Sequence, residues 1–299
     1  MDACPDHRLL RDHAYALVDA SHREQIPAGI ELLSLAQGVL ADSADILPSL
    51  VVLNRLTTEQ YEALLDLIEA QQAANEPAVL SALMLASCDV ERMRNHLSQV
   101  QLLHGPGGEH AWLRVHDPRV WLQLPRVLGN HELRKLYGPV TTWRVCIQSQ
   151  WVATHPPPAE VSQSDALYRS DKKRWAALQR IGIVNRALAN LGLMTYTQAV
   201  KHGPSLDALA LRGETRHGLR RTVDVVDYVC LGWRIHPLFD EHPIALSAIE
   251  EHERAMREGG EDADPGSSRI DALAAIDPSH WPRMRDELRT EYSGGDYGD

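Results

Sequence analysis

The chain has 299 residues, of which 44% are hydrophobic and 24% are charged, and its formal net charge is −11. This length exceeds that of most single domains, so we expect two lobes with full hydrophobic cores. The acidic balance argues against a nucleic-acid partner, which favours a basic surface. No apolar run approaches the roughly 18 residues of a membrane span. The charged N-terminus lacks an apolar signal segment, so we expect a cytosolic protein with no membrane partner.

Strand and helix signals alternate in the first hundred residues. The pattern predicts strands at 15–19 and 50–53, a helix at 30–40, and an apolar run at 79–88 that is either a strand or a buried helix. Thr57 and Gln60 have the spacing of a capping box at the start of a helix. Asp89 is expected to cap a further short helix, with Met93 and Leu97 directed inward. This alternation predicts a mixed α/β lobe.

The segment from Val100 to Val145 has the clearest local pattern. Two short apolar runs, at 100–103 and 111–116, flank a Gly-Pro-Gly-Gly loop and predict a β-hairpin. Asp117 followed by Pro118 predicts the start of a helix. The aspartate carboxylate can accept unpaired backbone N–H groups there, and proline gives up a donor that has no partner at this position.

Two short helices and one strand are expected after this start. Pro125 would cost a continuous helix about 3 kcal/mol, so we expect a break there, with Asn130 as the cap of the second piece. Gly138 and Pro139 end that piece. One half-buried strand is then expected at 142–152. Its inward side chains are those of Trp143, Val145, Ile147 and Trp151.

Helical signals dominate the rest of the chain. Ser164 or Asp165 is expected to cap a long amphipathic helix that ends at Gly192. A second capping box at Thr195–Gln198 opens a helix that we expect Gly203 to close. Further short helices are expected at 205–218, 222–233, 243–259 and 282–291.

These signals divide the chain into a mixed α/β lobe at 1–158, an all-α lobe at 159–258, and an acidic, partly disordered tail at 259–299. The predicted fold class is therefore α+β followed by all-α. Charge is unevenly distributed. Acidic and basic residues number 18 and 12 in 1–150, 9 and 12 in 151–249, and 14 and 6 in 250–299, which gives −6, +3 and −8. The positive middle segment is the exception in an acidic chain.

No complete motif for covalent or metal chemistry is visible. His104, His110 and His116 recur every six residues, but residues six apart on one strand are separated by about 20 Å. At most His104 and His110 face each other across the loop, and a tetrahedral zinc site needs three or four ligands. The Gly105–Gly108 loop lacks the lysine and hydroxyl residue of a phosphate-binding loop, and a Gly-x-Ser-x-Gly elbow is absent. We expect no catalytic residue, no metal and no cofactor.

Two groups of charged residues have both a structural and a functional interpretation. Arg114, Asp117 and Arg119 lie at the predicted strand-to-helix junction. Either Asp117 caps the helix and pairs with an arginine, or the junction presents Arg119 to a partner. The second group lies on the long helix, mostly opposite its apolar stripe, and consists of Arg169, Lys172, Lys173, Arg174, Arg180 and Arg186. It is either a solvated face or a docking strip for an acidic segment. Both interpretations stay open for each group.

Three short motifs carry a resemblance to a known family. The segments YALVDAS at 15–21, WLRVHDPRV at 112–120 and LYGPVTTW at 136–143 are similar to the effector chaperone (adaptor) family of bacterial type VI secretion. In that family, a strand ending in arginine and an Asp-Pro-Arg string precede a short helix and a Gly-Pro-Val element. The matching residues here are Arg114, Asp117, Pro118, Arg119, Gly138, Pro139 and Trp143. Val115 and His116 stand where the family more often has an aromatic pair.

The resemblance implies a non-catalytic cytosolic adaptor. Such a protein binds one toxin effector and helps to load it onto the VgrG spike, so the expected partners are the cognate toxin and VgrG. Two other function classes stay open, an immunity protein that neutralises a toxin and a metal-dependent hydrolase. A hydrolase would show a pocket in which several polar side chains converge. An immunity protein would protect cells from the toxin, whereas an adaptor would promote its export.

Overall fold

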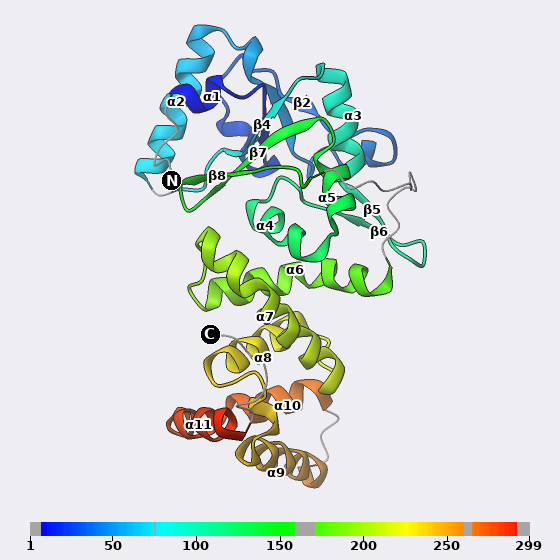
Figure 1. The fold of residues 1–299 in the computed structure, drawn as a ribbon, viewed down its shortest axis with the longest axis vertical. Coiled ribbons are helices and arrows are strands. Elements are labelled where there is room, and N and C mark those ends of the chain that lie inside the picture. The colour runs from blue at the N-terminus through cyan, green and yellow to red at the C-terminus, as the bar shows by residue number, and fades with distance from the viewer. Residues whose placement is uncertain (1–6, 75, 159–170, 260–264, 292–299) are drawn as a thin grey trace. The chain divides into compact units, whose positions relative to one another are not determined.

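The computed structural model describes residues 7–74, 76–158, 171–259 and 265–291. The chain forms a first unit, residues 1–179 and 194–200, and a second unit, residues 180–193 and 201–299. The described strands all lie in the first unit, and the described elements from 172 to 291 are all helices (Figure 1). The predicted class, α+β followed by all-α, is confirmed. Among the described residues, no helix combines the length and apolar character that crossing a membrane requires.

Six antiparallel strands form the central sheet of the first unit, in the order β2-β3-β1-β4-β7-β8. Their bounds are β1 Tyr15–Val18, β2 Leu33–Ser34, β3 Ser49–Val52, β4 Leu80–Ala86, β7 Val140–Ile147 and β8 Gln150–Thr154. All four residues of β1 and of β3 are buried. Burial without alternation indicates a sheet that is covered on both faces.

Helices cover the two faces of this sheet. Helix α2 (Thr58–Ala73) packs against the face that carries Ala16, Leu83 and Cys146. Trp143 is three residues from Cys146 on β7, so its side chain points to the opposite face. There it stacks on Trp121 of α4 (Pro118–Val127). Figure 1 shows α3 (Val90–Val100) on the opposite side of the sheet from α1 (His7–Arg11) and α2.

Local start signals in the first unit match the structure closely. Thr57 and Gln60 form the predicted capping box of α2. Asp89 caps α3, in which Met93 and Leu97 are fully buried. The predicted hairpin is formed by β5 (Leu102–His104) and β6 (His110–Trp112). The remaining elements are α5 Asn130–Tyr137 and the 3₁₀ turns η1 Ala20–Gln25, η2 Gly38–Ser43 and η3 Leu53–Arg55.

The single strand predicted at 142–152 is wrong, because the chain reverses within it. Strands β7 and β8 form an antiparallel hairpin around Gln148 and Ser149, whose φ angles are 46° and 61°. Two successive left-handed residues make the tight turn that suits the twist of paired strands. The reversal pairs Trp151 with Cys146. Trp151 therefore packs on the α2 face and not beside Trp143.

The helix predicted at 30–40 is absent. The segment forms the two-residue strand β2 and the turn η2. Gly29 and Gly38 adopt φ angles of 85° and 55°, which lie outside the right-handed helical region. Pairing of Leu33 and Ser34 with β3 satisfies backbone groups that a helix would otherwise satisfy.

Two predictions about the helices after Asp117 also need correction. Helix α4 does not break at Pro125 but continues to Val127. Pro125 lies in the last turn of α4, so its missing N–H removes only one hydrogen bond near the helix end. The cap of α5 is Gly129, and Asn130 is its first helical residue. The predicted end of α5 at Gly138, which has a φ of 54°, is confirmed.

The second unit is built from helices. The elements from 172 onward are α6 Lys172–Asn190, α7 Tyr196–Arg216, α8 Thr222–Arg234, η4 Phe239–Glu241, α9 Pro243–Gly259, α10 Pro265–Ala274, η5 Pro278–His280 and α11 Trp281–Glu291. Helices α6 and α7 both begin in the first unit. The predictions for α8, α9 and α11 are confirmed to within one or two residues. Helix α10 was not predicted, because the polar, acidic and glycine-containing run at 258–268 extends over its first turn.

Helix α7 overturns the predicted end at Gly203. It runs through Gly203 and Pro204 as one helix of 21 residues. Ala199, Leu206 and Leu209 are buried at helical spacing on both sides of the proline. Continuous burial of this stripe outweighs the proline penalty of about 3 kcal/mol.

The two predicted boundaries of α6 have different outcomes. The predicted caps Ser164 and Asp165 lie outside the described residues. Helix α6 begins at Lys172, where Asp171 accepts the backbone N–H of Arg174 at 2.8 Å. Its predicted stop at Gly192 is confirmed, with a φ of 71°.

Candidate functional site

Asp19 is the centre of the candidate site. It follows β1 directly and caps η1, accepting the Ser21 backbone N–H at 2.9 Å and the Ser21 hydroxyl at 2.7 Å on Oδ1. The hydrogen bond from His116 holds the pKa of Asp19 well below its usual range, and the Ser21 bonds act in the same direction against partial burial. Asp19 is therefore an anion whose first oxygen is already occupied.

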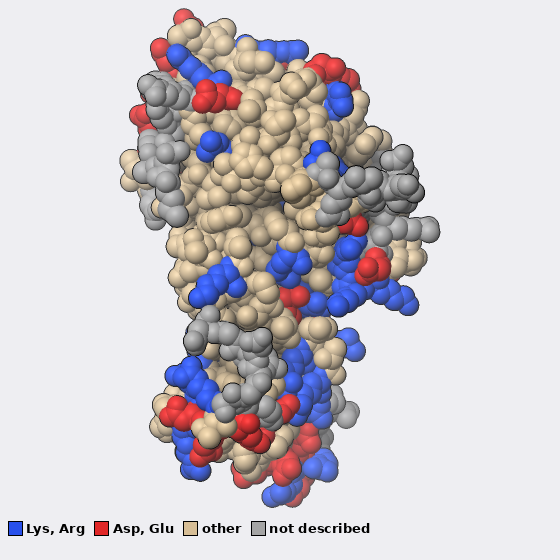
Figure 2. Space-filling model, in the orientation of Figure 1, with Lys and Arg blue, Asp and Glu red and all other residues tan. Residues whose placement is uncertain are grey.

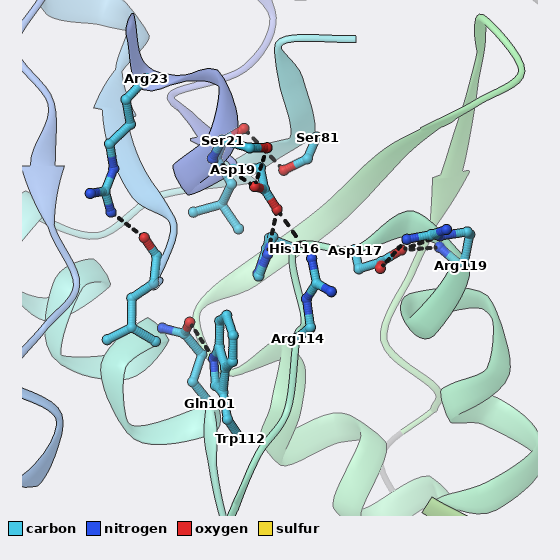
Figure 3. Close-up of polar contacts among 12 residues, drawn as sticks. Asp19, Ser21, Arg23, Ser81, Gln101, Trp112, Arg114, His116, Asp117 and Arg119 are labelled. Carbon is cyan, nitrogen blue, oxygen red and sulfur yellow. Dashed lines mark hydrogen bonds and ion pairs between the residues drawn. The ribbon is translucent and has the colours of Figure 1, made fainter. Parts of the chain in front are cut away.

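His116 and Arg114, which are distant from Asp19 in the sequence, reach the second oxygen of Asp19. His116 Nε2 lies 2.9 Å from Oδ2, and Arg114 Nη2 lies 3.4 Å from the same atom (Figure 3). A carboxylate only accepts hydrogen bonds, so Nε2 carries the proton. The His116 side chain is 1% exposed, and its Nδ1 has no hydrogen-bond partner among the described residues. The fold thus joins residues that are 97 positions apart.

Trp112 of β6 supports both of these side chains. Its ring stacks on His116 with centroids 5.6 Å apart, and the Arg114 guanidinium lies over the same ring at 5.6 Å. The Trp112 Nε1–H donates to Gln101 Oε1 at 3.3 Å, and Gln101, which is fully buried, donates to the Leu97 carbonyl. Through these contacts Trp112 fixes the orientation of the His116 and Arg114 side chains.

Asp117 and Arg119 form the second half of the site. Asp117 caps α4 by accepting the Arg119 backbone N–H at 3.0 Å. Its two oxygens also accept from Arg119 Nε at 3.0 Å and Nη2 at 2.8 Å. Burial alone would raise the pKa of Asp117, but the hydrogen bonds and charge of Arg119 outweigh burial and lower it. The Arg119 side chain is 57% exposed, so a buried carboxylate holds a solvent-facing guanidinium.

One pocket, with a volume of about 530 Å³, is lined by Asp19, Arg114, His116, Asp117 and Arg119. The β7–β8 turn contributes Gln148 and Ser149 to its wall, and apolar wall is supplied by Pro77, Ala78, Ile147 and Met194. Gln148 and Ser149 are the two non-glycine residues with positive φ in the described part of the chain. Such residues typically cost about 1–3 kcal/mol each and cluster at functional sites.

The structure separates the two predicted groups of partner-binding residues. Arg114, Asp117 and Arg119 meet at the pocket. In the other group, Arg169 lies outside the described residues, and the remaining members do not line the pocket. Arg180 is buried and pairs with Asp207 at 2.9 Å, so it does not lie on a solvated face. Lys172 and Lys173 are exposed, whereas Arg174 pairs with Glu132 of α5 at 2.7 Å. Arg174 therefore has a structural contact within the first unit, and a docking role for this strip stays a prediction.

Sequence reasoning missed Asp19 as a site residue and considered His116 only as a metal ligand, a role that it rejected. The only local signal for Asp19 is its position directly after a buried strand. No spacing rule relates it to His116. His104 and His110 do face each other as expected, with ring centroids 4.8 Å apart. Within the described ranges, no three His, Cys, Asp or Glu side chains are grouped so that they could hold a metal ion.

The cap on α4 gives the first prediction. Asp117→Ala removes the acceptor for the Arg119 backbone N–H, and we expect it to lower the free energy of unfolding of the first unit by about 0.5–2 kcal/mol. Asp117→Asn should cost less, because the amide oxygen still accepts. Urea denaturation, together with hydrogen exchange in α4, measures both changes. If both variants are as stable as wild type but lose a binding partner, Asp117 acts in recognition and not in capping.

No curated protein and no solved structure matches the chain. Residues 14–135, which include Asp19 and the whole Arg114–Arg119 junction, match the model of a family described as "Domain of unknown function (DUF4123)".

Proposed function

We propose that the protein is a non-catalytic cytosolic adaptor of a type VI secretion system, which binds one toxin effector and helps to load it onto the VgrG spike. Two observations on the sequence support this proposal. The motifs at 15–21, 112–120 and 136–143 resemble that adaptor family. The domain match over 14–135 covers the first of these motifs and the Asp-Pro-Arg string.

The geometry of the pocket is the observation that carries the proposal. The residues of the first two motifs do not stand apart on the surface but converge, with Asp19 bonded to Arg114 and His116, and Asp117 bonded to Arg119. Two guanidinium groups, 45% and 57% exposed, are each held by a less exposed carboxylate. Oriented arginines of this kind are frequent at protein interfaces, where they bind without any covalent step.

The surface of the first unit is also suited to a protein partner. Figure 2 shows few charged side chains around β7 and β8 on the face turned to the viewer, whereas Lys, Arg, Asp and Glu are interspersed over the second unit. Depletion of charge is a compositional feature of interface centres. An adaptor that binds the folded or partly folded toxin stabilises it by mass action and releases it at the spike.

Secretion by the source bacterium tests the proposal. Deleting the gene should lower secretion of one toxin to background while VgrG is still exported, and complementation with the full chain should restore it. The tagged protein should retain that toxin and VgrG from the cytosol. Unchanged toxin secretion in the deletion strain would contradict the proposal. If the deletion strain is instead killed by its own toxin while secretion continues, the protein is an immunity protein.

A further inference from the structure

We propose that the pocket between Asp19 and Arg119 binds a carboxylate group of a partner peptide, beside an apolar residue of the same segment. This inference rests on the proposed adaptor function and names the chemistry that the site recognises.

The first step is the set of free donors. Arg119 uses Nε and Nη2 to hold Asp117, and no described residue accepts from its Nη1. Arg114 uses only Nη2, at 3.4 Å from Asp19. Each guanidinium has five N–H groups in a planar fork. Both arginines line the pocket, so donors that their carboxylate partners do not use remain for a ligand.

The second step is that the acceptors are occupied. Asp19 accepts two hydrogen bonds on each of its oxygens, from Ser21 on one and from His116 and Arg114 on the other. Asp117 accepts three bonds, all from Arg119. A carboxylate offers about four acceptor positions, so a cationic ligand would have to break existing bonds. An anionic ligand pairs with the free guanidinium donors and breaks none.

The third step decides which anion. The charged residues of the pocket wall are Arg114 and Arg119 against Asp19, Glu76 and Asp117, a formal sum of −1 when the histidines are neutral. A dianionic phosphate would enter a site without surplus positive charge, and desolvating two charges there is unfavourable. A carboxylate carries a single charge, so its desolvation in this site costs less. It also matches the guanidinium fork, which can donate two parallel hydrogen bonds to it.

The fourth step is the size and the apolar wall. A volume of about 530 Å³ lies within the roughly 300–1,000 Å³ that encloses small ligands, and is larger than one carboxylate requires. Pro77, Ala78, Ile147 and Met194 offer contact for an apolar side chain next to the acid. The left-handed turn at Gln148 and Ser149 closes this wall. The ligand class that fits is a peptide segment with an acidic group beside an apolar residue.

Peptide selection on the full-length protein tests the assignment. Two pools of random synthetic heptapeptides, one with amidated and one with free C-termini, are passed over the immobilised protein, and retained peptides are identified by mass spectrometry. We expect retained peptides to carry Asp or Glu beside apolar residues, or a free C-terminal carboxylate beside one. A comparison of the two pools tells which source of carboxylate is used. No retained peptide, or retained peptides without this feature, would overturn the proposal.

Calorimetry on the retained peptides then tests the arginines. Arg119→Lys keeps the charge but loses the planar fork, and we expect it to weaken binding roughly tenfold or more, as should the Glu→Gln version of the peptide. Arg55→Ala is the matched control, because Arg55 is exposed in the same unit and does not line the pocket. Equal binding by Arg119→Lys would overturn the proposal. So would stronger competition by sodium phosphate than by sodium acetate at equal ionic strength.

The two proposals can fail separately. If Arg114→Gln/Arg119→Gln folds, retains the toxin and VgrG, and restores secretion like wild type, the pocket assignment is wrong and the adaptor function stands. If the wild-type protein retains acidic peptides but deletion of its gene has no effect on toxin secretion, the pocket binds carboxylates and the proposed adaptor function is wrong.

Discussion

Asp240→Ala should destabilise the second unit by about 3–5 kcal/mol, because it leaves a buried histidine and a partly buried arginine without their common partner. The Asp240 side chain is fully buried in η4. Its oxygens lie 2.8 Å from His217 Nε2, 3.0 Å from Arg212 Nε and 3.2 Å from Arg216 Nε. All three partners lie near the end of α7, so this one carboxylate ties α7 to the segment before α9.

The neighbouring Glu241 does not replace it. Glu241 accepts from Arg212 at 2.6 Å and from Arg216 at 2.7 Å, but its side chain is 27% exposed. Water screens its ion pairs more than those of the fully buried Asp240. Without Asp240, the donors of His217 and Arg212 that it accepts would be buried without that acceptor, which lowers the free energy of unfolding. Glu241 recovers only part of that cost.

The same carboxylate makes the stability of the second unit depend on pH in the acid range. Burial would raise the pKa of Asp240, but the hydrogen bonds from His217 and Arg212 outweigh it and lower the pKa. A lowered folded-state pKa means that the contribution is complete above the usual aspartate value of about 4 and is lost as the pH falls below it. In Asp240→Asn, the free energy of unfolding of this unit should therefore depend less on pH across that acid range.

Hydrogen exchange resolved by peptide measures these effects within one unit of a two-unit chain. Protection in α7 and α8 should fall in Asp240→Ala, while protection in β1 and β4 should stay as in wild type. Asp271→Ala is the control, because Asp271 is an exposed carboxylate on α10 of the same unit, and exposed substitutions usually change stability by less than about 0.5 kcal/mol. Equal exchange in Asp240→Ala and Asp271→Ala would contradict the structural role given to Asp240.

Trp143→Ala should destabilise the first unit by about 3–5 kcal/mol. Trp143 is fully buried on β7, and its ring stacks on Trp121 of α4 with centroids 4.0 Å apart and an interplanar angle of 14°. This stack joins the sheet to the helix that Asp117 caps. Removing the ring leaves a cavity on the sheet face that α4 covers. We expect Asp117 and Arg119 to lose their fixed position as a result.

Trp143→Phe separates the ring from its N–H group. The Trp143 Nε1–H is buried without a hydrogen-bond partner among the described residues, whereas Trp121 Nε1 donates to Thr154 at 3.0 Å. Phenylalanine keeps an aromatic face for Trp121 and removes an unsatisfied donor. It should therefore cost much less than alanine. The free energies of unfolding of Trp143→Phe and Trp143→Ala are compared by urea denaturation that is followed by hydrogen exchange of the β7 and α4 amides. Equal losses of stability would show that ring stacking is not what Trp143 contributes.

Features decided by a few neighbouring residues were predictable from the sequence. The caps at Thr57, Asp89 and Asp117 and the stop at Gly138 were correct. In each of them a side chain or a glycine acts on backbone groups within about one helical turn. The inward positions of Met93 and Leu97 on α3 were also predicted correctly, and the order of strands and helices indicated the fold class. Arg114, Asp117 and Arg119 were placed at the junction for the same local reason.

Only the tertiary structure decided the partners of those residues. Asp19 and His116 meet because β1 and the β5–β6 hairpin belong to one packed unit, and nothing local to either residue encodes a contact across 97 positions. Packing likewise overrode local preference at Pro204, where a buried stripe carries α7 through a helix breaker. It also decided the turn at Gln148 and Ser149, where pairing of β7 with β8 holds two residues in a conformation that their own side chains disfavour. A local signal specifies which backbone groups need a partner, and the free energy of burial over the whole unit determines which distant residues provide it.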